Sequence, residues 1–102
     1  MSILVCIPAY NEGKVIDSVI KKCFKFSDHV VVCDDGSTDD TYEVADAAGA
    51  HVIRHSTNIG KGEALRTLFK FALHSKDDII VTIDGDGQFL PEEIPKLVSD
   101  IK

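Results

Sequence analysis

The sequence lacks any apolar run long enough to cross a lipid bilayer. Its longest runs, residues 3–7 and 30–33, fall far short of the ~20 residues that a membrane-spanning helix needs. A secretory signal is also missing, because Pro8 interrupts the apolar start and the polar residues Asn11 and Glu12 follow it. We therefore expect a cytoplasmic protein, or one that acts at the cytoplasmic face of a membrane.

Cysteine and positive charge are both scarce. Cys6, Cys23 and Cys33 are widely spaced in apolar stretches and form no Cys-x-x-Cys pair, which predicts reduced core residues rather than a metal or redox site. Lysine and arginine total 11 against 17 acidic residues, and the net charge of −6 argues against a nucleic-acid partner. A phosphate ligand is still allowed, because a metal ion held by carboxylates can supply the positive charge.

Two common phosphate-binding signatures are missing as well. The first predicted strand is followed by Pro-Ala-Tyr-Asn-Glu at residues 8–12, not by the Gly-x-Gly-x-x-Gly of dinucleotide-binding folds. Gly60-Lys61-Gly62 lacks the spacing of a P-loop. Its backbone N–H groups and the Lys61 ammonium could approach a diphosphate at a helix start, and a plain flexible turn is the alternative.

What the sequence does contain is a regular alternation of strands and helices. Short β-rich runs predict strands at residues 3–7, 30–33, 51–54 and 79–83. Apolar spacing predicts helices at residues 14–26, 38–48, 63–74 and 91–101, the second capped by Ser37 or Thr38 and ended by Gly49. We therefore predict one α/β domain over residues 1–102, a three-layer, doubly wound, mostly parallel sheet with helices on both faces.

The polar residues gather where the predicted strands end. The segments after the four strands are residues 8–12, 34–39, 56–62 and 84–88, and they hold five of the seven glycines and six acidic residues. Ligands of open parallel sheets bind outside the carboxyl ends of the strands, so we expect these segments to form one ligand site. The four histidines show no ligand spacing and are expected at the surface or at strand edges. An open sheet edge could also pair with a second copy to give a homo-oligomer.

Residues 84–88, Asp-Gly-Asp-Gly-Gln, predict a site for a divalent cation. Asp84 and Asp86 would repel each other at the end of a buried strand unless a cation joined them, and Gln88 supplies another oxygen. Mg²⁺ and Mn²⁺ favour such oxygen ligands and keep positions for substrate phosphates. A plain Asp/Gly turn is the simpler alternative.

Two known motifs compete for the same segment. An EF-hand needs Gly at its sixth position and Glu at its twelfth, where this sequence has Phe89 and Pro95, so the EF-hand fails. The nucleophile motif of haloacid-dehalogenase-type phosphatases, with Asp84 as nucleophile, is a weaker rival, because in that family it normally follows the first strand.

Asp34 and Asp35 end the second predicted strand, where dinucleotide-binding folds place the acid that contacts a ribose. This position predicts a nucleoside contact for Asp35. Ser37, Thr38, Asp39 and Asp40 follow directly, and helix capping explains them better than ligand binding.

Taken in order, these motifs resemble those of the family 2 glycosyltransferases. The matching segments are residues 8–12, 34–39, 58–64 and 84–88, and the dolichol-phosphate mannose synthase branch is the most similar. The resemblance implies a GT-A fold, with Pro8, Tyr10 and Glu12 beside the base and ribose, and with contacts from the Cys33 backbone and the Asp35 side chain. It further implies Asp84, Asp86 and Gln88 as metal ligands, with Gly85 close to the diphosphate.

The same resemblance implies a reaction and a set of partners. The reaction is inverting transfer from GDP-mannose or a UDP-sugar to an acceptor, a polyprenyl or dolichyl phosphate or a glycan, assisted by Mg²⁺ or Mn²⁺. A GT-A domain of this family has roughly twice this length, so we expect the acceptor contacts and any catalytic base to lie beyond Lys102. Donor binding without turnover is the expectation for residues 1–102, and a non-catalytic nucleotide-binding module is the alternative.

Overall fold

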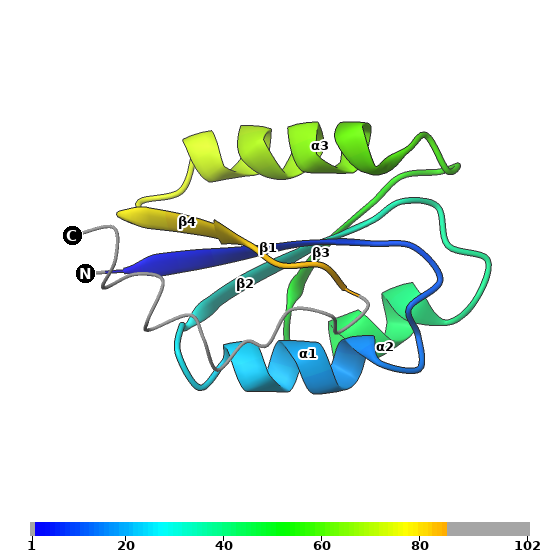
Figure 1. Cartoon of the computed structure of the whole chain (residues 1–102), viewed down its shortest axis with the longest axis horizontal. Helices are drawn as coiled ribbons and strands as arrows, with labels where there is room; N and C mark the ends of the chain where they lie inside the picture. Colours follow the sequence, from blue (N-terminus) through cyan, green and yellow to red (C-terminus); the bar gives the residue numbers. More distant parts are fainter. Residues whose placement is uncertain (1, 86–102) are drawn as a thin grey trace.

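The computed structural model describes residues 2–85, which form four strands and three helices in strict alternation (Figure 1). None of the helices described in this range is long and apolar enough to cross a membrane. In chain order the elements are β1 (Ile3–Ala9), α1 (Ile16–Cys23), β2 (His29–Asp34), α2 (Thr41–Ala47), β3 (His51–Arg54), α3 (Lys61–Leu73) and β4 (Ile79–Thr82).

The four strands form one parallel sheet in the order β3-β2-β1-β4. β1 lies inside the sheet, bonded to β2 on one side and to β4 on the other. Continuous apolar residues suit such a strand, because helices cover both of its faces and every residue after the partly buried Ile3 is buried. All four carboxyl ends therefore point to the same edge of the sheet, as the sequence predicts.

Two hydrophobic cores lie on opposite faces of this sheet. Val5 and Ile7 of β1 point toward α1 and α2, while Leu4 and Cys6 point toward α3, because successive side chains of a strand alternate between faces. Figure 1 shows the resulting three layers, with α3 on one side of the strands and α1 and α2 on the other. The three-layer α/β prediction is confirmed.

Several predicted boundaries are wrong by two or three residues. α1 begins at Ile16 rather than Lys14, because a turn comes first, in which the N–H groups of Val15 and Ile16 both donate to the Glu12 carbonyl. α1 ends at Cys23 rather than at residue 26, because the N–H groups of residues 26 and 27 both turn back to the Cys23 carbonyl. β1 continues through Pro8 to Ala9, because Pro8 keeps its carbonyl to accept from Gly85.

The predicted start of α2 is also wrong. α2 begins at Thr41 rather than at Thr38, and the residue at its N-cap position, Asp40, makes no side-chain capping hydrogen bond. The predicted end is confirmed, because Gly49 has a φ of +98° and closes the helix with a bond from its N–H to the Asp46 carbonyl. α3 starts two residues earlier than predicted, at Lys61. The fourth predicted helix, residues 91–101, lies outside the described residues.

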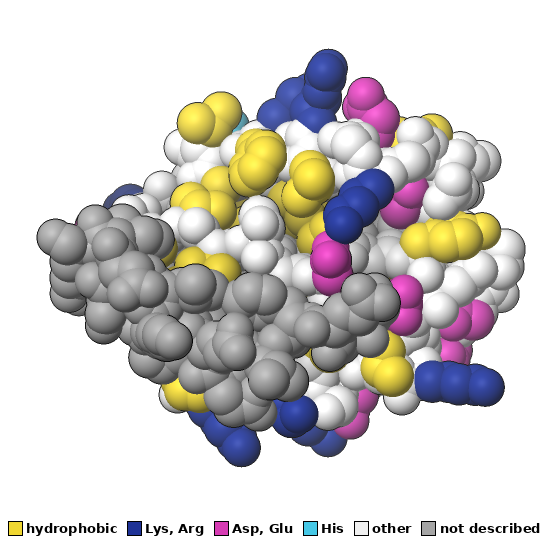
Figure 2. Space-filling model, viewed as in Figure 1, with side chains coloured by type: hydrophobic (Ala, Val, Ile, Leu, Met, Phe, Trp, Pro, Cys, Tyr) yellow, Lys and Arg dark blue, Asp and Glu magenta, His cyan; other side chains and the backbone are white. Residues whose placement is uncertain are grey.

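Apolar side chains are exposed where α3 meets β4. Phe69 and Leu73 on α3 and Ile80 on β4 are 49%, 82% and 37% exposed, and Figure 2 shows apolar side chains gathered over this part of the molecule. Ile80 pairs with Leu4 and shares its face of the sheet, so it faces the same layer as α3. Self-association through the open edge of the sheet stays a prediction.

Gly36 offers a test of how closely the loops after β2 and β3 approach each other. Its φ is +71°, and a Cβ there would lie 2.3 Å from the Thr57 carbonyl carbon. We expect Gly36→Ala to lower the free energy of unfolding by about 1–3 kcal/mol, measured by urea denaturation. Gly62→Ala is the control, because Gly62 lies in α3 and no residue packed against the helix lies within 4 Å of its Cβ position. Alanine is more stable than glycine in a helix, so this change should raise the free energy of unfolding by about 0.5–1 kcal/mol. Equal stability of Gly36→Ala and the wild type would contradict this close approach.

Candidate functional site

A cavity of about 470 Å³ opens at the carboxyl edge of the sheet. It lies where the segments after the four strands converge, so the prediction of a single rim is confirmed for the described residues. Seven of the predicted site residues line it: Pro8, Tyr10, Glu12, Asp35, Lys61, Asp84 and Gly85. Asp86 and Gln88 lie outside the described residues. Ala9, Asn58, Gly60 and Ala64 complete the lining.

The loop after β1 is bound to residues 37–41 by side-chain hydrogen bonds, and two of the residues involved, Ser37 and Thr38, are ones that the sequence analysis took for helix caps. The Asn11 N–H donates to Ser37 Oγ at 2.9 Å, and the Thr38 N–H donates to Asn11 Oδ1 at 2.9 Å. The Glu12 N–H donates to Thr41 Oγ1, also at 2.9 Å. Asn11 has a φ of +53°, a conformation that asparagine tolerates better than most residues.

Asp39 belongs to the same set of contacts. It accepts from the Gly13 N–H at 3.1 Å and from both the N–H and the hydroxyl of Thr41. The Thr41 hydroxyl bond, opposed by burial and supported by the two N–H groups, holds the pKa of Asp39 below its usual range. The capping interpretation is therefore wrong for Ser37 and Thr38, which bind the loop after β1. It is confirmed for Asp39, whose Oδ1 accepts from the N–H of Thr41, the first residue of α2, while its Oδ2 holds Gly13. Together these residues hold the Tyr10–Glu12 side of the cavity in place.

Asp35 organises the opposite side of the cavity. Its carboxylate is only 3% exposed, and each of its oxygens accepts from two donors. Oδ1 lies 2.8 Å from His55 Nδ1 and 3.1 Å from the Ile59 N–H, while Oδ2 lies 3.1 Å from Asn58 Nδ2 and 2.9 Å from the Gly60 N–H. The carboxylate thus fixes the loop between β3 and α3.

The charge of Asp35 is stabilised by these donors. Burial raises the pKa of this carboxyl, and the hydrogen bonds from His55 and from the N–H groups of Ile59 and Gly60 outweigh burial, so that the pKa lies below its usual range. The predicted nucleoside contact remains compatible with the place of Asp35 in the cavity lining.

His55 is a residue that the sequence analysis missed. It was expected at the surface or at a strand edge; it directly follows β3, an edge strand, but its side chain is only 14% exposed. Its Nδ1 contacts Asp35, and its Nε2 lies 2.8 Å from the Thr67 hydroxyl of α3, so the ring joins the end of β2 to the helix on that face. A signal was available, because His55 directly follows a strand, at the same edge of the sheet as Asp35.

Cys33 does not line the cavity. It is fully buried in β2 beneath α3, with its Sγ 3.6 Å from His55 Nε2. Burial, and then the nearby carboxylates of Asp35 and Asp34, raise its pKa to about 12. All three cysteines are free and buried, which confirms the prediction of reduced core residues.

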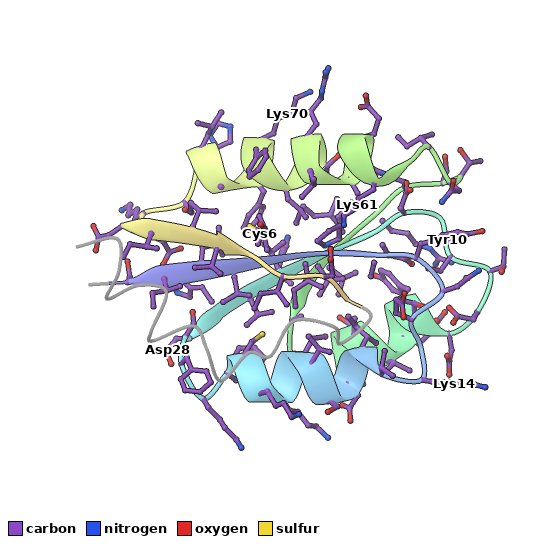
Figure 3. The ribbon with its side chains drawn as sticks, in the orientation of Figure 1. Cys6, Tyr10, Lys14, Asp28, Lys61 and Lys70 are labelled. Atoms are coloured by element: carbon purple, nitrogen blue, oxygen red, sulfur yellow. The ribbon has the colours of Figure 1, made fainter. Side chains whose placement is uncertain are left out.

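Asp84 and Lys61 form an ion pair at the cavity, with Asp84 Oδ1 2.6 Å from Lys61 Nζ. Both side chains are partly exposed, and Figure 3 shows Lys61 reaching from α3 toward the sheet. The next residue, Gly85, is buried, and a Cβ there would lie 3.1 Å from Ala9 Cβ and 3.2 Å from the Pro8 carbonyl oxygen. The backbone at Asp84 is thus held tightly against β1.

This arrangement suits a divalent cation at Asp84. The carboxylate already holds a positively charged group, and its oxygens are the hard ligands that Mg²⁺ and Mn²⁺ favour. Within residues 2–85, no group of three or more His, Cys, Asp or Glu side chains could hold a metal. The other two predicted ligands, Asp86 and Gln88, lie outside that range.

Replacing Asp35 tests whether its carboxylate holds the cavity together. Asp35→Asn removes the charge and turns one acceptor oxygen into a donor, so at neutral pH we expect the free energy of unfolding to fall by about 2–3 kcal/mol. Because the folded pKa is depressed, this stabilisation is present above the ordinary carboxyl range and is lost as the pH falls through the folded pKa. The difference from the wild type should therefore shrink in acid. Asp46→Asn, an exposed change on α2, is the control, and an equal effect of the two changes would contradict this role.

The chain matches Glycosyl transferase family 2 over residues 4–102. It is 33% identical, over 97% of its length, to the UDP-N-acetylglucosamine–dolichyl-phosphate N-acetylglucosaminyltransferase of Methanococcus voltae, and covers 47% of that protein. It is 34% identical, over 100% of its length, to the undecaprenyl-phosphate mannosyltransferase of Micrococcus luteus, and covers 45% of it.

A solved structure agrees with these relatives. The glucosyl-3-phosphoglycerate synthase of Mycobacterium tuberculosis, in complex with Mn²⁺, UDP-glucose and phosphoglyceric acid, matches with a TM-score of 0.79 and 34% identity. The match covers 98% of this chain and 39% of that one, so this chain spans less than half the length of each of the three proteins. The extent of the family match favours a transferase over a phosphatase that uses Asp84. By sequence and by fold, the chain belongs to glycosyl transferase family 2.

Proposed function

We propose that this chain supplies the donor site of an inverting glycosyltransferase that moves a sugar from a nucleoside diphosphate to a polyprenyl or dolichyl phosphate. The observation that carries the proposal is the cavity at the carboxyl edge of the sheet, with a carboxylate and an ammonium group on its wall. The two relatives named for transfer to dolichyl phosphate and undecaprenyl phosphate support the acceptor class.

The nucleoside is assigned to the side of the cavity formed by β1 and β2. Tyr10 is 43% exposed at the cavity and offers a ring face for stacking on a base, while Glu12 offers a carboxylate for the polar edge of the nucleoside. Asp35 lines the same side, and a nucleoside contact to its carboxylate would have to replace one of the four hydrogen bonds that it already accepts. Pro8, which lines the cavity, would border the same ligand. The base, guanine or uracil, is left to the binding experiment, although UDP-glucose in the bacterial synthase structure favours uracil.

The diphosphate is assigned to the Asp84 side of the cavity. Asp84, together with Asp86 and Gln88, would hold a divalent cation there, and Gly85, which lines the cavity, would lie close to the diphosphate. The cation, when bound, neutralises the charge that develops on the leaving nucleoside diphosphate. Structures of the mycobacterial synthase with Mn²⁺ or with Mg²⁺ support a cation of this class.

The acceptor is assigned to protein surface outside residues 1–102. A lipid phosphate is already an anion, so its attack on the sugar needs less help from a general base than attack by a hydroxyl group would. An acceptor of this kind would place the whole protein at the cytoplasmic face of a membrane.

The donor assignment predicts nucleotide binding that depends on a divalent cation. Isothermal titration with UDP and GDP should give measurable affinity with Mn²⁺ and little with a chelator, because the carboxylates repel a bare diphosphate. Asp84→Asn should lose the Mn²⁺ dependence, whereas Asp46→Asn on α2 should keep it. Equal affinity with Mn²⁺ and with chelator would remove the metal-bridge part of the proposal.

The acceptor assignment predicts that residues 1–102 bind the sugar donor without transferring the sugar. Residues 1–102 should bind the donor but show no transfer of radiolabelled sugar from GDP-mannose, UDP-glucose or UDP-N-acetylglucosamine to a short polyprenyl phosphate. Holding both substrates in line can supply about 7–11 kcal/mol of barrier reduction, and a donor site alone forfeits most of it. A protein extended to the length of its relatives should transfer. Efficient transfer by residues 1–102 as a monomer would overturn this prediction, and an extended protein that binds donor without transfer would indicate a non-catalytic module.

A further inference from the structure

The contact between Lys61 and Asp84 joins two elements that are not neighbours in the chain. Lys61 is the first residue of α3, and Asp84 follows β4, yet Nζ and Oδ1 lie 2.6 Å apart. Both residues line the cavity that we assign to the donor. The ammonium group therefore lies against the carboxylate to which the proposed function assigns a divalent cation.

Two cations cannot share this oxygen at such a distance without strong repulsion. At separations of about 3–4 Å, like charges oppose each other by an amount that is significant even near a solvated surface. A divalent cation that binds Asp84 through Oδ1 must therefore displace the Lys61 ammonium group, and one that binds through Oδ2 would still repel it at short range. The displaced group would still be beside the cavity, because its backbone is held in the first turn of α3.

We propose that Lys61 is an exchangeable internal cation: its ammonium group holds Asp84 in the nucleotide-free chain and moves to the donor diphosphate when a divalent cation binds Asp84. This inference rests on the proposed function and adds a role for Lys61 in the order of events at the site. In this scheme Lys61 first competes with the cation and then supports the nucleotide that arrives with it.

The surroundings of the two residues suit this exchange, because the backbone at Asp84 is held while the Lys61 side chain is exposed. Asp84 is followed by Gly85, whose Cβ position is crowded by Ala9, Pro8 and Ile16 at 3.1–3.3 Å. The Lys61 side chain, in contrast, is 63% exposed at the first residue of α3. We therefore expect the lysine side chain to move while the Asp84 backbone stays in place.

The strength of the pair is also suited to exchange. The two side chains are 63% and 45% exposed, so water screens the attraction and the pair contributes little stability. A lysine ammonium on a flexible four-carbon stem can change partners at low cost, unlike the planar and bidentate arginine group. The pair neutralises Asp84 between turnovers and yields to a divalent cation.

The test uses Lys61→Met in residues 1–102, with Lys70→Met as the matched control. Lys70 is an exposed lysine on the same helix, so its replacement removes the same charge at a distance from the cavity. Mn²⁺ binding without nucleotide is followed by the electron paramagnetic resonance signal of free Mn²⁺. Lys61→Met should bind Mn²⁺ about two- to fivefold more tightly than the wild type, while Lys70→Met should stay close to the wild type.

The second measurement is UDP binding at saturating Mn²⁺, by calorimetry. The same change that tightens Mn²⁺ binding should weaken UDP binding. Lys61→Met should lower the affinity for UDP about tenfold or more, because a charge-assisted contact to the diphosphate is lost. Adding Asp84→Asn to Lys61→Met should abolish the gain in Mn²⁺ affinity, since the competition acts through Asp84.

The outcomes separate this inference from the proposed function. If the wild type binds UDP only with Mn²⁺ but Lys61→Met leaves Mn²⁺ affinity unchanged or lowers it, the exchange is overturned and the donor site stands. If Lys61→Met gains Mn²⁺ affinity without losing UDP affinity, the move to the diphosphate is overturned. If the wild type binds neither Mn²⁺ nor UDP, the exchange falls together with the proposed function.

Discussion

The carboxylate of Asp35 holds the cavity edge together. It follows β2 directly and receives four hydrogen bonds, all from residues 55–60 in the loop that follows β3. A buried charge is costly unless donors surround it, and here the loop takes the conformation that supplies them. Gly60, with a φ of +110°, lets the backbone bring its N–H to Asp35 just before α3 begins. The start of α3, and with it the place of Lys61, therefore depends on this one carboxylate.

A second constraint acts between the loops after β1 and β2. Side chains from residues 37–41 bind the backbone of residues 11–13, and these bonds place Tyr10 and Glu12 beside the cavity. Asp39 and Asp35 thus do comparable work on two sides of the same cavity, each by binding a neighbouring loop. Some acidic residues of this protein, such as Asp35 and Asp39, bind neighbouring loops, whereas Asp84 is assigned to the ligand. The sequence alone did not distinguish these two roles.

Charge balance at the cavity depends on few groups. The chain carries a net charge of −6, and acidic side chains follow β2 and β4 at the carboxyl edge. His55 faces Asp35 and Lys61 faces Asp84, so each of these two carboxylates at the cavity has a nitrogen partner. The Asp35 pair is buried and hydrogen-bonded on all sides, whereas the Asp84 pair is open to solvent. This difference in exposure is the physical reason to treat the first as permanent and the second as replaceable.

The sequence by itself determined the order of strands and helices, the parallel sheet and the edge at which the site lies. The strands and helices follow from the periodicity of apolar residues within each short segment. Once the segments alternate, parallel strands must all end at the same edge of the sheet, which places the site there. Only the tertiary structure decided what Ser37, Thr38 and Asp39 bind, that His55 is enclosed, and that Lys61 reaches Asp84. Capping and loop bonding use the same residue types, so the choice depends on which backbone groups come close in space, and the approach of separate loops is set by the packed sheet.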